Sequence, residues 1–286
     1  MNSTTNQNEK DQNPSGSELG KKIIYDLSYN PERLYPIPRK EKRIEIGIDP
    51  IKIPFFGFDC WNHYEVSWLN EKGKPIVAIA EIYYDCASPK IVESKSLKLY
   101  FNSLNHFRSK NAAEIEKLVK KDLEKIIESE VIVHIYELGK APMPELQEKF
   151  SGICLDDLDI ECDCYTVKPD YLSTKNEQVQ ETLYSDLLKS NCLVTNQPDW
   201  GSVQISYQGS KIDHAGLLKY LVSYRNHNEF HEQCIERIFA DIMHYCKPSE
   251  LSVYGRYTRR GGLDINPYRS TKKIDFKNLN FRLLRQ

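Results

Sequence analysis

The fold of this chain is decided by a stretch that occurs twice. Leu97-Lys98-Leu99-Tyr100-Phe101-Asn102-Ser103 is matched without a gap by Leu217-Leu218-Lys219-Tyr220-Leu221-Val222-Ser223, at an offset of 120 positions. The same offset pairs Ile115 with Ile235 and Val131 with Leu251. Agreement of apolar positions over about forty residues indicates that the chain contains two copies of one module.

Both copies predict the same order of secondary-structure elements. Runs of alternating or apolar residues predict strands at 76–83, 131–137, 203–207 and 251–257. Two helices are predicted in each copy, at 95–107 and 111–128 in the first and at 215–226 and 228–246 in the second. The order ββααββ predicts an α+β fold, in which each module has an antiparallel sheet with both helices on one face.

The modules predict a division of the chain into four parts. Residues 1–22 are polar and rich in Asn, Ser and Gln, which is typical of a disordered tail. Residues 23–140 form the first module and residues 176–286 the second. Residues 141–175 contain three prolines and many acidic residues, and we expect either a linker or the terminal strand of the first module.

Composition excludes several classes of protein. A net charge of −2 leaves no excess of positive charge for phosphates, so we expect no direct nucleic-acid partner. No apolar run is long enough to span a membrane, and the polar N-terminus lacks the core of a signal peptide, so we expect a cytoplasmic protein. Eight cysteines without a secretion signal indicate reduced thiols. The loose group Cys154, Cys162 and Cys164 lacks a second pair, so ordinary cysteines are favoured over a zinc site.

The second copy contains a candidate nucleophile. Cys192 and Asp199 lie seven positions apart across Pro198, at the expected mouth of a β-hairpin. A free thiol has a pKa near ~8.5, so a working site must lower that value or supply a base. The pattern also suits a buried cysteine and an ordinary turn aspartate. Neither residue has a counterpart in the first copy, which indicates either a composite site between modules or drift on an exposed surface.

Two further motifs carry polar side chains with alternative interpretations. His227 and His231 have the i, i+4 spacing of a metal pair, but the sequence is not H-E-x-x-H and offers no third ligand, so we expect no metal. Glu232 suits either two parallel hydrogen bonds from a guanine-like ring edge or a solvated helix position. Arg259-Arg260-Gly261-Gly262 suits either phosphate binding or a basic hairpin turn.

Four blocks together resemble a known family. Glu93–Tyr100, Ser190–Gly201, Phe230–Cys234 and Arg259–Asp264 are similar to the conserved blocks of the NADPH-dependent nitrile reductases of queuosine biosynthesis, the QueF family. The resemblance runs from about residue 20 to the C-terminus and follows the longer, two-module form of the family.

The resemblance implies a fold, a reaction and a set of site residues. The fold is the tunnelling fold, whose modules associate into a barrel with purine-like ligands between them, here in a homodimer. The reaction is reduction of 7-cyano-7-deazaguanine to 7-aminomethyl-7-deazaguanine with two NADPH and no metal. Cys192 would form a thioimide with the nitrile and Asp199 would act as general acid. Substrate would be bound by Val92, Glu93, Ser94, His231 and Glu232, and NADPH by Ser94, Lys95, Arg260 and Gly261.

Other functions on the same residues stay open from sequence. A cysteine hydrolase would share the thioimide but place a water where hydride is delivered. A non-catalytic purine- or pterin-binding protein would need neither Cys192 nor Asp199. A metal-dependent cyclohydrolase of the same fold is disfavoured, because its ligand set is missing.

Overall fold

A computed structural model gives the structure of the protein and describes residues 25–140, 145–275 and 279–286. The predicted tail, residues 1–22, lies outside them. The first half contains η1 (Pro31–Arg33), β1 (Pro36–Pro38), α1 (Lys40–Glu45), β2 (Phe56–Leu69), β3 (Pro75–Asp85), β4 (Lys90–Val92), α2 (Ser94–Ser103), η2 (Leu104–His106), α3 (Ala112–Ile127) and β5 (Val131–Glu137). The rest contains β6 (Leu146–Gln147), β7 (Ile153–Cys154), η3 (Pro169–Tyr171), β8 (Thr174–Ser185), β9 (Lys189–Asn191), β10 (Pro198–Ile212), α4 (His214–Val222), η4 (Ser223–Asn226), α5 (His231–Tyr245), β11 (Glu250–Tyr257), β12 (Leu263–Ser270) and β13 (Arg282–Leu283). No helix within these ranges is long and apolar enough to cross a membrane.

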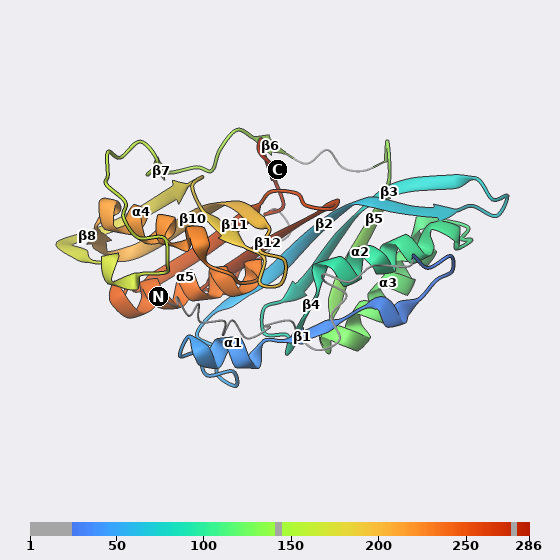
Figure 1. Cartoon of the computed structure of the whole chain (residues 1–286), viewed down its shortest axis with the longest axis horizontal. Helices are drawn as coiled ribbons and strands as arrows, with labels where there is room; N and C mark the ends of the chain where they lie inside the picture. Colours follow the sequence, from blue (N-terminus) through green and yellow to red (C-terminus); the bar gives the residue numbers. More distant parts are fainter. Residues whose placement is uncertain (1–24, 141–144, 276–278) are drawn as a thin grey trace, which may run out of the picture.

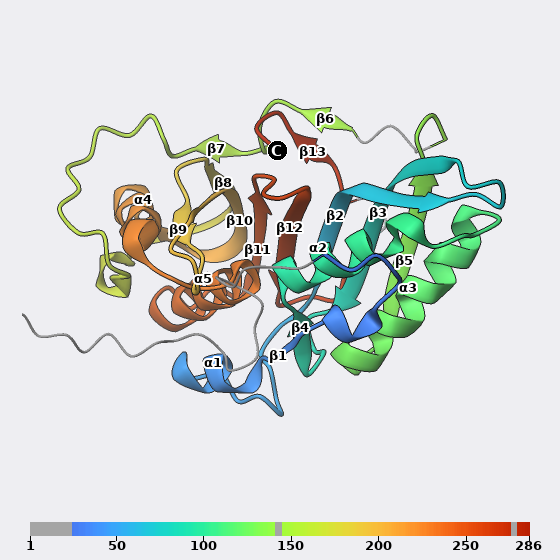
Figure 2. The same cartoon turned by 45° about the vertical axis from the view of Figure 1, so that its right-hand side comes forward.

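Nine strands, drawn from both modules, form one continuous sheet. Its order is β5-β3-β2-β12-β11-β10-β8-β7, with β9 paired to β10. Neighbouring strands are antiparallel except for β7 and β8. The helices of both modules lie on the same side of the sheet, α2 and α3 over the first module and α4 and α5 over the second (Figures 1 and 2). The α+β prediction with both helices on one face is confirmed.

The seam between the modules is the pairing of β2 with β12. Eight consecutive residue pairs join these strands, from Leu263 with His63 to Ser270 with Phe56. Gly57 permits the closest approach, because a Cβ there would lie 1.9 Å from the Tyr268 carbonyl oxygen. The modules are therefore fixed edge to edge, and residues next to the seam can form one site.

The two copies repeat the same hydrogen bonds, as duplication predicts. Tyr100 donates to Asp122 at 2.6 Å in the first module, and Tyr220 donates to Asp241 at 2.6 Å in the second. An acidic residue caps the first helix of each pair, Glu93 in α2 and Asp213 in α4. Carboxylates at this position satisfy backbone N–H groups that would otherwise lack partners.

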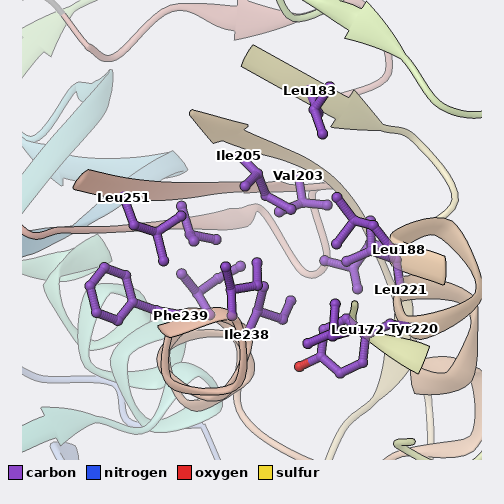
Figure 3. Close-up of a cluster of buried hydrophobic side chains, with 14 of the residues drawn as sticks. Leu172, Leu183, Leu188, Val203, Ile205, Tyr220, Leu221, Ile238, Phe239 and Leu251 are labelled. Atoms are coloured by element: carbon purple, nitrogen blue, oxygen red, sulfur yellow. The ribbon is translucent and has the colours of Figure 1, made fainter. Parts of the chain in front are cut away.

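Each helix pair covers an apolar core on its half of the sheet. In α5 the residues Ile235, Ile238, Phe239 and Ile242 are fully buried, at the spacing that a helix lying on a sheet requires. They meet Val203, Ile205 and Leu251 from the strands, as Figure 3 shows for this core. The first module has an equivalent core between α2, α3 and its strands.

The segment between the modules does not complete the first sheet. Its two described strands pair elsewhere: β6 runs parallel to β13, and β7 runs parallel to β8 at the far edge of the second module. The described part of 141–175, expected to be either a linker or the terminal strand of the first module, therefore adds no strand to the sheet of that module. In the described residues, the first module is ββααβ, and β2 uses its free edge to pair with β12.

Candidate active site

Cys192 and Asp199 flank the turn of a β-hairpin that joins β9 to β10. Cys192 directly follows β9, and Asp199 is the second residue of β10, paired with Ser190. The turn closes through a hydrogen bond from the Cys192 amide to the Gln197 carbonyl at 2.8 Å. The other side of β9 bonds to the loop before α5, through the Asn191 amide and the His227 carbonyl at 2.8 Å. The hairpin therefore holds Cys192 beside the start of α5. The hairpin itself was expected from the sequence.

Both modules line the cavity that contains Cys192 and Asp199. The second module contributes the hairpin, the start of α5 and the β11–β12 turn. The first module contributes β4, the start of α2 and Trp61 of β2. The lining residues are Trp61, Ile91, Val92, Ser94, Cys192, Asp199, Phe230, His231, Glu232, Arg260 and Ile265. Residues of both modules thus line one cavity within a single chain, and the sequence analysis did not single out Trp61, Ile91, Phe230 and Ile265 for it.

A histidine and an arginine side chain approach the Asp199 carboxylate. Nε2 of His231 lies 3.3 Å from Oδ2, and Nη1 of Arg260 lies 3.1 Å from Oδ1. The His231 ring is stacked on Tyr257, with ring centres 3.9 Å apart and planes at 6°. Tyr257 is fully buried, so its ring fixes the plane of the imidazole. His231 can therefore exchange a proton with Asp199 along a defined direction.

Glu232 offers an acceptor that no neighbour uses. It is 1% exposed, and its Oε1 accepts no hydrogen bond from the described residues. Buried polar atoms without partners are uncommon in folded proteins, so this oxygen is suited to a ligand that donates N–H bonds. Burial, and next the negative charge of Asp59, raise the pKa of Glu232 to about 8.

Behind Glu232 lies a buried cluster of charges that sequence reasoning did not find. Arg39, Arg43 and Arg269 meet Asp59 and Glu236, all of them buried. Arg269 lies 2.8 Å from Asp59 and 2.9 Å from Glu236. Burial raises the pKa of Glu236, but Arg269 and the other arginines outweigh it and lower the pKa to about 2. The cluster ties α1, β2, α5 and β12 together beneath the site.

Glu93, predicted to bind substrate, is the N-cap of α2 in the structure. Its carboxylate accepts hydrogen bonds from the backbone amides of Lys95 at 2.8 Å and Ser96 at 2.7 Å, as the N-cap of α2. Its neighbours Val92 and Ser94 line the cavity, whereas Glu93 is not among the lining residues. The carboxylate binds at this helix end because the first backbone amides of α2 have no partner within the helix.

A second cavity adjoins the first and is basic. It is lined by Ser94, Lys95, Lys98, Thr195, Gln197, Arg260, Gly261 and Leu263. Ser94 and Arg260 line both cavities, so the two cavities are adjacent. All four residues predicted for NADPH meet here, and the structure adds Lys98, which lies 3.0 Å from Glu65. Three cationic side chains and a glycine turn suit a phosphorylated ligand.

Comparison with known proteins identifies the family. The family model described as nitrile reductase, 7-cyano-7-deazaguanine-reductase N-term matches residues 25–135, and the model described as QueF-like protein matches residues 198–275. A protein of Legionella pneumophila (strain Corby), called NADPH-dependent 7-cyano-7-deazaguanine reductase, is 65% identical over 94% of this chain and 95% of its own length. This chain belongs to the nitrile reductase family. The family resemblance inferred from sequence is thereby confirmed.

More distant nitrile reductases agree. Proteins with the same name from Dechloromonas aromatica (strain RCB) and Coxiella burnetii (strain CbuK_Q154) are 54% and 52% identical, over 89% and 94% of this chain and 90% and 96% of their own lengths. A solved structure, the archaeosine synthase QueF-Like in the apo form, matches 35% of this chain and 99% of its own, with 14% identity and a TM-score of 0.30, too distant a likeness to add to this.

The histidine pair of this nitrile reductase is not arranged as its spacing suggested. The predicted helix 228–246 begins only at His231, and His227 lies in extended backbone before it. His227 instead lies 2.9 Å from Glu229. The described ranges hold no group of three or more His, Cys, Asp or Glu side chains placed to bind a metal ion.

Proposed function

We propose that this protein reduces 7-cyano-7-deazaguanine to 7-aminomethyl-7-deazaguanine with NADPH. One observation carries the proposal. In a chain of the nitrile reductase family, a thiol, a carboxylate and an unpartnered buried acceptor meet in one cavity between the modules. The product would serve queuosine synthesis and hence tRNA modification, although the chain would act on the free base.

Cys192 performs the first step of the proposed reaction. Its sulfur adds to the nitrile carbon, so that a C–S bond forms and the C≡N bond becomes C=N. The thiol proton passes to Asp199 and from it to the nitrogen, which leaves a neutral thioimide. A nitrile accepts hydride poorly and a thioimide accepts it more readily, so the covalent step divides one difficult reduction into easier ones.

The remaining steps need a proton and a dry cavity. NADPH supplies a hydride to the carbon in each of two reductions. After the first, the C–S bond breaks, the thiolate of Cys192 is regenerated and an imine remains. After the second, the nitrogen takes a proton, for which Asp199 with its neighbour His231 is the source. Because water would hydrolyse the imine, the apolar wall of Trp61 and Ile265 keeps it from solvent.

Substrate orientation is assigned to Glu232. A deazaguanine edge presents two adjacent N–H groups, and a carboxylate accepts both in parallel. The unpartnered Oε1 of Glu232 supports this role. Glu93 acts through α2. By capping the helix, it fixes Ser94 at the cavity of Cys192 and Lys95 at the adjoining basic cavity.

The second cavity is assigned to NADPH. Lys95, Lys98 and Arg260 supply positive charge for its phosphates, and Gly261 lets the backbone approach. We also propose a cytoplasmic homodimer, in which sheets of two chains close the barrel that the family fold implies.

The stoichiometry of NADPH consumption tests the proposal. Purified protein with a limiting amount of the nitrile is expected to oxidise two NADPH for each amine formed. The isosteric variant Cys192→Ser is expected to oxidise none. Formation of amide or acid without NADPH oxidation would instead establish a nitrile hydrolase, and binding without turnover would establish a binding protein.

A further inference from the structure

Arg260 stands between the two cavities. Its guanidinium is about one-third exposed, and it lines both the cavity of Cys192 and the basic cavity beside it. On one side its Nη1 lies 3.1 Å from Oδ1 of Asp199. That nitrogen is buried and makes no hydrogen bond of good geometry, so the ion pair engages the arginine only in part.

The backbone that follows Arg260 forms a tight turn. Gly261 and Gly262 follow it with φ values of +60° and +80°, a region that other residues rarely adopt. Arg259 is anchored separately, with its guanidinium 3.6 Å from the centre of the Tyr64 ring. The turn is therefore fixed on one side of Arg260 and tightly bent on the other, while the Arg260 side chain lines both cavities.

We propose that Arg260 links NADPH binding to Asp199, because one guanidinium serves two anions in turn. Without NADPH it pairs with the Asp199 carboxylate. When NADPH enters, its phosphate pairs with the guanidinium, and Asp199 keeps its contact with His231. The carboxylate is then free to turn toward the substrate nitrogen. This inference rests on the proposed function and adds a coupling between the hydride donor and the proton donor.

Coupling of this kind must be reciprocal. If the phosphate and Asp199 compete for Arg260, removing the Asp199 charge strengthens NADPH binding. The gain must vanish when Arg260 is also removed. A partly exposed ion pair of this kind changes an equilibrium by about twofold to fivefold.

A double-mutant cycle tests the coupling without turnover. NADPH affinity is measured by fluorescence titration for the full chain and for Asp199→Asn, Arg260→Ala and the double variant. Asp199→Asn is expected to tighten binding about twofold to fivefold, and to change it little when Arg260 is already alanine. Glu65→Gln is the matched control: it removes a carboxylate paired with Lys98 at the same cavity, so its effect is expected to persist in the Arg260→Ala background.

Equal tightening by Asp199→Asn in both backgrounds would overturn the coupling, because it would then be a general effect of charge. No tightening in the parent would overturn it as well. Either result leaves the proposed reductase intact as long as the parent binds NADPH and turns over. A parent that does not bind NADPH would overturn the proposed function and the coupling together.

Discussion

The affinity for the nitrile is expected to rise steeply with pH, because of Glu232. Burial and Asp59 raise the pKa of Glu232 to about 8, while Arg39 and Arg269 act in the opposite direction. A ring edge with two N–H donors binds the ionised carboxylate, so binding at neutral pH must first remove a proton. With a pKa of about 8, roughly 1% of Glu232 is ionised at pH 6, about 9% at pH 7 and half at pH 8.

These fractions set the size of the effect. Affinity is expected to increase about ninefold from pH 6 to 7 and about fivefold from pH 7 to 8, and to level off above that. The assay is calorimetric titration of the nitrile into Cys192→Ala, which cannot form the covalent adduct. Repeating it in buffers of different ionisation enthalpy counts the protons, and about 0.9 proton is expected to be released per substrate at pH 7.

The variant Glu232→Gln provides the control. Its affinity is expected to be lower at pH 8 and nearly independent of pH, with no proton released. An affinity of the Cys192→Ala protein that does not change between pH 6 and 8 would refute the reasoning. So would a pH dependence that persists in Glu232→Gln, since another group would then be titrating.

Three further predictions follow from the same contacts. Tyr257→Leu removes the ring that stacks on His231 and is expected to lower kcat about threefold to tenfold. Tyr257→Phe keeps the stack, so its kcat is expected to stay close to that of the parent. Equal losses in the two variants would show that the hydroxyl, not the ring, matters. Glu232 has its pKa raised on folding from 4.5, so the native state holds a proton that the unfolded state releases, and stability is lost as pH rises from about 4.5 to 8. Glu232→Gln is therefore expected to raise the melting temperature more at pH 8 than at pH 5, and the opposite trend would contradict the sign. Gly57→Ala places a Cβ against a strand carbonyl and is expected to lower the free energy of unfolding by about 3 kcal/mol or more in urea titrations. The control Gly47→Ala has open space but a φ of +74°, and it is expected to cost about 1–2 kcal/mol. Equal costs would exclude the seam contact as the cause.

Sequence periodicity predicted the parts of this molecule that are local. The repeat predicted the helix pairs, since apolar spacing along a helix records which face meets the sheet. The hairpin of Cys192 and Asp199 was also predictable, because short strands and the turn between them lie within a dozen residues. The family resemblance brought in His231 and Arg260, and the structure places both beside Asp199.

What sequence could not supply is long-range pairing. Arg43 forms an ion pair with Glu236, which lies 193 positions away, and the sequence around neither residue indicates its partner. The seam is similar: besides β3 of its own module, β2 pairs with β12 of the second module, which the repeat alone does not predict. Glu93 shows a different limit. Its neighbours Val92 and Ser94 line the cavity, but only the structure shows that the Glu93 carboxylate caps α2.

The central claim is that Cys192, in a cavity built by both modules, captures the nitrile carbon. The most direct test is the intact mass of the purified chain mixed with the nitrile in the absence of NADPH. We expect a gain equal to one nitrile molecule, which is mapped to Cys192, is absent in Cys192→Ala and disappears when NADPH is added. An unchanged mass in the parent, or an adduct that persists in Cys192→Ala, would contradict the account.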